Sequence, residues 1–145
     1  MKIITQNKKA THDYFIETKY EAGIILKGSE VKAIRLGKVN LNDSFVFIKN
    51  QEVFINNMHI AKYEQANLFN HQELRVRKLL LNHKEILKLI SKTKEQGYTI
   101  IPLKVYLKDS LIKLEIALAK GKKNYDKRQT LKQKDMDMRL KKSLR

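Results

Sequence analysis

The residues best suited to binding chemistry lie near the end of the chain, in residues 119–128 (Ala-Lys-Gly-Lys-Lys-Asn-Tyr-Asp-Lys-Arg). Five of these side chains are positively charged and one is aromatic. Lysine and arginine bind phosphates, and an aromatic ring stacks on a base, so this block is suited to a nucleic acid. It also divides the chain. Apolar and polar residues alternate before it, whereas residues 121–145 hold ten Lys or Arg, three Asp and too few apolar residues for a core.

Glu21 is a candidate for base recognition, within a strand-like run that begins at Tyr20. On a protein expected to bind an acidic partner, a carboxylate can accept hydrogen bonds from the amino or imino groups of a base, which lysines cannot do. The simpler alternative is an edge carboxylate paired with a nearby Lys or Arg. Physical reasoning alone favours this second interpretation.

A basic cluster precedes three leucines in the middle of the chain. In an extended segment Arg75 and Arg77 share one face, and we expect Val76 to point inward. Together with Lys78 they are well placed for a phosphate backbone, although a merely solvated charge run is the open alternative. Residues 79–81 are expected to be mainly core, with room for one leucine to face outward.

No catalytic or metal-binding motif accompanies the histidines, whose spacings match no ligand pattern. The glycines are scattered, and no serine lies in a nucleophile motif. We therefore expect no enzyme activity, no metal and no cofactor. Two alternatives of other classes stay open: a hydrolase acting on RNA or peptidyl-tRNA through His12 or His59, and a general ribosomal or nucleoid packaging protein. The histidines are His12, His59, His71 and His83.

The composition points to a polyanionic partner. The chain of 145 residues carries a formal net charge of +16, which favours nucleic acid over an anionic membrane face. It has no cysteine, which excludes disulfides and thiolate zinc sites and fits a reducing compartment. The first residues lack the apolar run of a signal peptide, and no segment approaches 18 apolar residues. We therefore expect a cytoplasmic protein without a membrane partner.

The apolar pattern predicts mostly short strands and two secure helices. One helix follows Gly28-Ser29 and ends near Gly37, and the other starts at Asn82, has Glu85 in a capping-box position and ends by Gly97. The strands are expected in residues 14–26 (one bent strand or two short ones), in a hairpin of 45–48 with 53–55, and in a hairpin of 98–107 with 111–118.

About six short antiparallel strands with two or three flanking helices predict a mainly β (α+β) fold. An OB-like small β-barrel is the first choice, because closure hides sheet edges and such barrels bind nucleic acid. The strand order does not follow from the sequence. We expect residues 1–120 to form this RNA-binding barrel and residues 121–145 to form a basic tail.

The tail has a weak helical pattern. Asp135 precedes Arg139, and Asp137 precedes Lys141, by four residues, which is the favourable order for helical ion pairs. Apolar residues are too few to hold a free helix in water. We therefore expect a tail that is disordered when free and helical when docked on a partner.

Six sequence blocks, in order and spacing, resemble the SsrA-binding protein (SmpB) family, the protein partners of transfer-messenger RNA. The resemblance covers nearly the whole chain from Asn7. The blocks are residues 7–10 (Asn-Lys-Lys-Ala), 20–24 (Tyr-Glu-Ala-Gly-Ile), 28–32 (Gly-Ser-Glu-Val-Lys), 40–44 (Asn-Leu-Asn-Asp-Ser), 75–81 (Arg-Val-Arg-Lys-Leu-Leu-Leu) and 119–128.

The resemblance implies an OB-like protein, acting as a monomer on its RNA, that binds the tRNA-like domain of transfer-messenger RNA. The complex would enter stalled bacterial ribosomes, where the tail would lie as a helix in the empty mRNA channel near the decoding centre. By motif match the resemblance implies RNA-binding roles for Asn7, Glu21, Leu80, Gly121, Lys122 and Lys123. To these we add, as expected RNA-binding residues, Lys8, Lys9, Arg75, Arg77 and Lys78. By motif match it also implies that Asp126, Lys127 and Arg128 are needed for accommodation in the ribosome. We expect Tyr125, Lys132 and Lys134 to be further ribosome contacts of the tail.

Two positions depart from the family pattern. Lys62 and Glu73 stand where the family usually has prolines, so we expect a looser loop between them. Glu73 also adds a negative charge near the expected RNA face.

Overall fold

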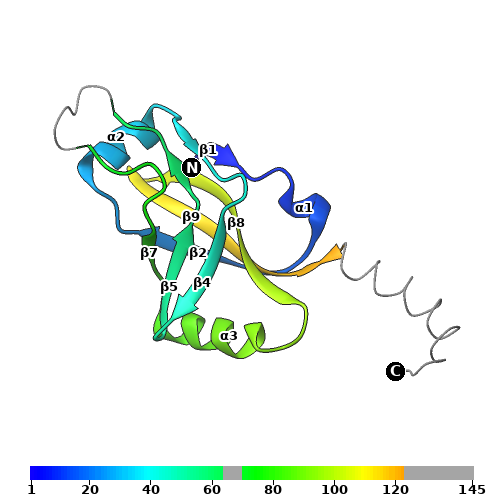
Figure 1. Ribbon diagram of the computed structural model, residues 1–145. Helices are drawn as coiled ribbons and strands as arrows, with labels where there is room; N and C mark the ends of the chain where they lie inside the picture. Colours follow the sequence, from blue (N-terminus) through cyan, green and yellow to red (C-terminus); the bar gives the residue numbers. More distant parts are fainter. Residues whose placement is uncertain (64–69, 123–145) are drawn as a thin grey trace, which may run out of the picture.

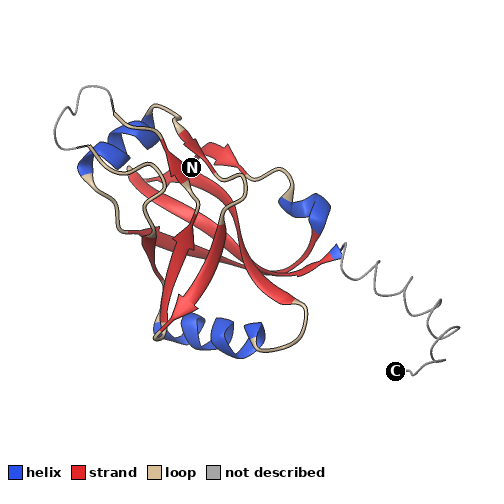
Figure 2. Cartoon of the chain, viewed as in Figure 1, coloured by secondary structure: helices blue, strands red, loops and turns tan. Residues whose placement is uncertain are grey.

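The computed structural model describes residues 1–63 and 70–122 (Figure 1). This part of the chain is mainly strand, with short helices at the periphery (Figure 2). None of the helices in these ranges is long and apolar enough to cross a membrane. The elements are, in order, β1 (Lys2–Gln6), α1 (Ala10–Asp13), β2 (Tyr14–Ile24), α2 (Gly28–Arg35), β3 (Val39–Asn40), β4 (Phe45–Lys49), β5 (Glu52–Asn56), β6 (His59–Ile60), β7 (Arg77–Leu80), α3 (His83–Thr93), β8 (Tyr98–Lys108) and β9 (Leu111–Gly121).

Six strands form a closed ring of antiparallel pairings, in the order β8-β4-β5-β7-β2-β9 and back to β8. β1 pairs with β8 outside this ring, and β3 and β6 form a separate two-stranded sheet. The seam between β4 and β8 is short, with one pairing between Val46 and Ile100. The expected mainly β, OB-like fold is confirmed, and the ring supplies the strand order that the sequence left open.

Both expected hairpins are confirmed, and each has a two-residue turn. Asn50 and Gln51 join β4 to β5 with φ of 53° and 61°, and Asp109 and Ser110 join β8 to β9 with φ of 50° and 70°. Positive φ at both central positions gives a type I′ turn, whose twist matches that of the strands. Asn and Asp adopt such angles more readily than most residues, which explains their use here.

β2 is one long strand that pairs with β9 along its length and with β7 at its far end. Tyr14 lies opposite Gly121, and Glu21 lies opposite Glu115. The pairing of β2 with β9 shifts between Ile16 and Thr18, where the strand has an irregularity. Gly23 lies opposite Leu80.

The two helices expected from capping signals are present, at opposite ends of the ring in Figure 1. α2 ends before Gly37, whose φ is +79° and whose N–H donates to the carbonyl of Ile34. α3 begins after Asn82, whose N–H donates to the carboxylate of Glu85 at 3.1 Å. The short elements β1, α1 and β3 were not expected, whereas β6 falls where Met58, Ile60 and Tyr63 suggest a further extended piece.

The interior holds a large apolar cluster, and a smaller one lies between α1, β2 and the outer face of β8 and β9. The first includes Ile34 and Leu89, so α2 and α3 each contribute to the core of the ring. The second consists of Ala10, Ile101, Leu103, Ala117 and Ala119, with Tyr14 and Ile16 packed against them.

A buried ion pair ties α2 to β7. The side chains of Glu30 and Arg77 are fully buried, and Arg77 Nε donates to Glu30 Oε2 at 2.6 Å. Arg75 donates to Glu30 Oε1 at 2.6 Å, and the Lys27 N–H donates to it at 2.8 Å. Burial raises the pKa of Glu30, but these hydrogen bonds outweigh burial and hold the pKa below its ordinary value. Glu30 is therefore an ionised carboxylate in the protein interior.

Arg77 also satisfies backbone carbonyls, donating to Met58 at 2.6 Å and to Gln72 and Glu73 at 3.4 and 3.3 Å. Its orientation overturns two expectations. Arg77 points inward and has no exposed surface for a phosphate, whereas Val76, expected inside, is 44% exposed. The reason is that a buried carboxylate requires a cation beside it, and this requirement outweighs the burial of one valine.

We predict that Arg77→Ala destabilises the fold by about 3–5 kcal/mol, because the buried Glu30 carboxylate loses its buried cation and keeps only the partly exposed Arg75. Urea unfolding measures the change. The neighbouring Lys78→Ala is the control: Lys78 pairs with Glu52 on the surface at 2.7 Å, and its loss should cost about 1 kcal/mol or less. Equal losses in the two variants would contradict the prediction.

Candidate nucleic-acid interface

Glu21 lies on the outer side of β2 with its side chain 38% exposed. Its Oε2 accepts a hydrogen bond from the Tyr106 hydroxyl at 2.5 Å, and Lys108 Nζ lies 3.4 Å from both carboxylate oxygens. The simpler sequence interpretation, a carboxylate paired with a nearby lysine, therefore describes part of its environment. The exposed part of the carboxylate keeps room for further donors.

The charge state of Glu21 follows from these partners. The Tyr106 hydrogen bond lowers the pKa of Glu21, and Lys108 adds to this effect against the opposing influence of burial. Burial raises the pKa of Tyr106, and its hydrogen bond to Glu21 raises it further, so Tyr106 stays protonated and acts as the donor. Glu21 is thus held as an ionised acceptor at neutral pH.

An open depression of about 480 Å³ lies beside Glu21. Leu80 is 50% exposed on one side of it, opposite Gly23, and Lys113 and Glu85 supply charges of opposite sign. A Cβ at Gly23 would lie 3.5 Å from Leu80 Cβ, which is ordinary van der Waals contact, so the two positions are close neighbours across the strands. This arrangement offers a hydrogen-bond acceptor, an apolar surface and a cation within one surface hollow, which suits a nucleobase with its phosphate.

The three basic residues that precede Leu80 have different environments in the structure. Lys78 shares the outer face of β7 with Leu80, and its ammonium pairs with Glu52. Arg75 is 25% exposed and is held by Glu30. Arg77 is buried, so a phosphate contact from it is ruled out in this conformation.

Other expected RNA-binding residues gather at the opposite end of β2. Asn7 donates to the carbonyl of Pro102 at 3.0 Å, and Lys8 and Lys9 follow it on the surface before α1. Gly121 lies opposite Tyr14. Tyr14 is seven residues from Glu21 along β2, which is roughly 20 Å at the usual strand rise. The candidate residues therefore form two groups at the two ends of one strand, and not one continuous site.

Lysines at this second end lie over aromatic rings. Lys122 Nζ lies 5.1 Å from the Phe15 ring centroid and donates to the carbonyl of Thr11 at 3.0 Å. Lys120 and Lys92 lie 5.0 and 5.3 Å from the Tyr98 ring centroid. Such contacts hold cations on the surface in defined positions. The remaining expected residues lie outside the described ranges: Lys123, Tyr125, Asp126, Lys127, Arg128, Lys132 and Lys134.

The histidines do not converge on one site. His71 is buried, with Nε2 2.8 Å from the carbonyl of Ile60 and Nδ1 2.8 Å from Ser29 Oγ. A carbonyl can only accept, so Nε2 carries the proton. His59 lies 3.5 Å from Glu73, and His12 contacts Asp13 on the surface. These contacts are structural, and they leave no histidine pair poised for hydrolysis in the described ranges.

Comparison with known proteins identifies the family. The family model described as "SmpB protein" matches residues 4–145. The chain belongs to the SmpB family. Its relatives include the "SsrA-binding protein" of Bacillus subtilis (strain 168), 56% identical over 99% of this chain and 92% of the relative. That of Geotalea uraniireducens (strain Rf4) is 60% identical over 93% of this chain and 89% of the relative.

A solved structure supports the same assignment. It is described as "tmRNA-SmpB: a journey to the center of the bacterial ribosome", and a chain in it is 42% identical with a TM-score of 0.68. The match covers 81% of this chain and 83% of that chain. The fold described above is therefore an SmpB fold, and the SmpB family consists of RNA-binding proteins and not enzymes.

Sequence reasoning missed the residues that approach Glu21 from other strands. Tyr106 and Lys108 reach Glu21 from β8, a strand more than 80 residues away in the sequence. Lys113 reaches it from β9, which pairs with β2. The alternating pattern of β9 could have placed Lys113 on an outer face, but the pairing of β9 with β2 was not available from the pattern.

We predict that Tyr106→Phe raises the pKa of Glu21 toward its ordinary value, because the hydrogen bond that lowers it is lost. Carboxyl NMR titration of the full chain measures the shift. Tyr98→Phe is the matched control, since the Tyr98 hydroxyl donates to Glu17 at 2.6 Å, on the same strand. A Glu21 titration that is the same in both variants would show that Tyr106 does not set this charge.

Proposed function

We propose that this chain binds the tRNA-like domain of transfer-messenger RNA and delivers it to stalled ribosomes for rescue by trans-translation. Membership of the SmpB family across nearly the full length is the observation that carries this proposal. The relatives are named for SsrA binding, and the solved structure pairs SmpB with transfer-messenger RNA at the ribosome. The site of action is then the cytoplasm, and one copy of the chain binds each RNA.

The Glu21 depression is the proposed contact for the folded RNA. The ionised Glu21 accepts from base amino or imino groups, and the exposed Leu80 packs against a base or ribose. Lysines at the rim, such as Lys113, bind phosphates. Specificity comes from the acceptor and from shape, while the net charge of +16 supplies the affinity that does not depend on sequence.

The basic tail is proposed to act on the ribosome. Residues 121–145 carry ten of the 31 Lys and Arg of the chain and follow directly from β9. A segment so poor in apolar residues gains phosphate partners in an rRNA-lined channel, which offsets the entropy lost when it forms a helix. Asp126, Lys127 and Arg128 lie at the start of this segment and are the proposed contacts near the decoding centre.

We predict that Glu21→Gln weakens binding to a tRNA-like RNA by about 1–3 kcal/mol, because the amide offers a poorer acceptor to the base. The dependence of log K on log salt should stay nearly unchanged, since no phosphate contact is lost. Glu17→Gln is the control, because Glu17 is also on β2 and also accepts from a tyrosine hydroxyl. Equal binding by the two variants would remove Glu21 from the RNA site.

A competition assay separates this function from general RNA packaging. The proposal requires that a tRNA-like RNA competes far better than a random RNA duplex of the same length for the full chain. Equal competition would indicate a packaging protein that binds phosphates alone.

We predict that Leu131→Pro abolishes rescue of stalled ribosomes with little effect on binding to the isolated tRNA-like RNA, because proline breaks the helix that the tail forms on the ribosome. A reconstituted trans-translation reaction measures rescue. Leu131→Ala is the control, since it shortens the side chain without preventing a helix. Normal rescue by the proline variant would overturn the helical role of the tail.

A further inference from the structure

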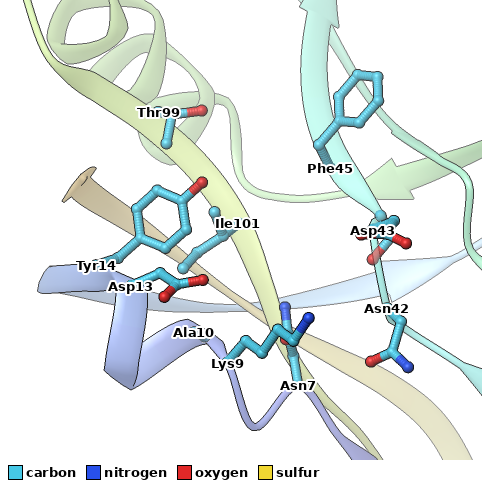
Figure 3. Close-up of a pocket in the computed structure, with 11 residues that line it drawn as sticks. Asn7, Lys9, Ala10, Asp13, Tyr14, Asn42, Asp43, Phe45, Thr99 and Ile101 are labelled. Carbon is cyan, nitrogen blue, oxygen red and sulfur yellow. The ribbon is translucent and has the colours of Figure 1, made fainter. Parts of the chain in front are cut away.

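A second hollow lies at the end of β2 away from Glu21, between α1, β8 and the segment that leads into β4. Its volume is about 160 Å³. Figure 3 shows its side chains arranged around one space, with the rings of Tyr14 and Phe45 on opposite sides and Ile101 between them. It borders the short seam where β4 and β8 pair only through Val46 and Ile100.

The size and walls suit one small planar ring. An engineered protein cavity of about 150 Å³ holds benzene, so a space of 160 Å³ is on the scale of a six-membered ring. Phe45 is 42% exposed, and Tyr14 is partly exposed. Aromatic side chains at such a place provide stacking surfaces for a base.

The hollow offers hydrogen-bond acceptors next to one cationic donor, Lys9. Asn7 uses its side-chain N–H to donate to the carbonyl of Pro102, which leaves the amide oxygen to accept. The Asp43 carboxylate and the Lys9 ammonium make no hydrogen bond or ion pair with any residue described in the structure. They are therefore available to a ligand.

The local charge disfavours a phosphate. The charged side chains that line the hollow are Lys9, Asp13 and Asp43, with a sum of −1 on a chain whose formal net charge is +16. A phosphate would meet two carboxylates here, whereas an amino group would meet acceptors. Among the bases, cytosine combines a single six-membered ring with an exocyclic amino group, and aspartate is a recognised acceptor for that group.

The position of Asp43 is fixed by its loop. The backbone of Asp43 has φ of +62°, and its carbonyl accepts from the Asn57 side chain at 3.5 Å. On either side, the Asn42 N–H donates to the Asn40 side chain at 2.7 Å, and the Ser44 hydroxyl donates to the carbonyl of Leu41. These bonds define the backbone that carries the carboxylate before any ligand binds, which lowers the cost of binding.

We infer that this hollow binds the base of an unpaired cytidine in the RNA partner, with Tyr14 and Phe45 as stacking surfaces and Asp43 accepting from the amino group. The inference rests on the proposed function of RNA binding and adds to it a second, base-selective subsite. Roughly 20 Å of β2 separates this subsite from Glu21, so the two do not compete for the same nucleotide.

The test compares two probes of equal charge on the full chain, the single-stranded RNAs r(C5) and r(U5), which differ in the amino group. We expect r(C5) to bind about tenfold more tightly, because uridine presents a carbonyl to Asp43 where cytidine presents an amino group. Amide NMR signals of Phe45 and Thr99 should shift with r(C5). Equal affinities for the two probes would overturn the inference.

Asp43→Asn should reduce the preference for r(C5) to less than about threefold, since the amide can serve either pyrimidine. Asparagine tolerates positive φ, so the loop keeps its shape. Asp109→Asn is the matched control, with the same loss of charge at a positive φ of 50° in the β8–β9 turn. A preference that survives in Asp43→Asn, or that falls equally in Asp109→Asn, would also overturn the inference.

The same proteins distinguish this inference from the proposed function. If the full chain selects a tRNA-like RNA over random duplex but binds r(C5) and r(U5) equally, only the cytidine subsite is wrong. If it fails to select the tRNA-like RNA, the proposed function fails, whatever the two short probes show.

Discussion

The buried carboxylate of Glu30 is the constraint on which the rest of this structure depends. It lies in the first turn of α2 and needs cations in the interior, and Arg77 and Arg75 of another segment provide them. Through Arg77 the same cluster holds the carbonyls of Met58, Gln72 and Glu73. One charge thus joins a helix, a strand of the ring and two loops that are far apart in the sequence.

This ion pair also decides which residues of β7 reach the surface. Successive side chains of a strand point to opposite faces, so placing Arg77 inside sends Lys78 and Leu80 outside. Leu80 then meets Gly23 beside Glu21 and completes the apolar side of the depression. The surface proposed to bind RNA is therefore a consequence of a buried contact that is itself inaccessible to RNA.

What the sequence predicts, and what it does not, follows from the distance over which each signal acts. The hairpin turns and the capping of α3 depend on neighbouring residues, and they were predicted correctly. The orientation of Val76 and Arg77 was wrong because it depends on Glu30, which is 47 residues from Arg77 and gives no local sign of burial. β1 is short and gains stability only by pairing with β8, about 100 residues away, so its own pattern could not reveal it. For the site, Glu21 was a candidate from its chemistry and Leu80 came from motif resemblance. Tyr106, Lys108 and Lys113 meet Glu21 only through the pairings of β2, β8 and β9.

β2 and β9 set the distance between the two groups of candidate RNA-binding residues. Glu21 lies near one end of their shared ladder, opposite Glu115, while Tyr14 and Gly121 pair at the other end. The chain beyond Gly121 therefore continues from the end that carries Lys122, Phe15 and the acidic hollow, and not from the end that carries the Glu21 depression. Two rigid strands keep these ends roughly 20 Å apart. An RNA that reaches both groups of candidate residues must therefore span roughly 20 Å of this surface, and the second group lies at the end of β9 from which the basic tail continues.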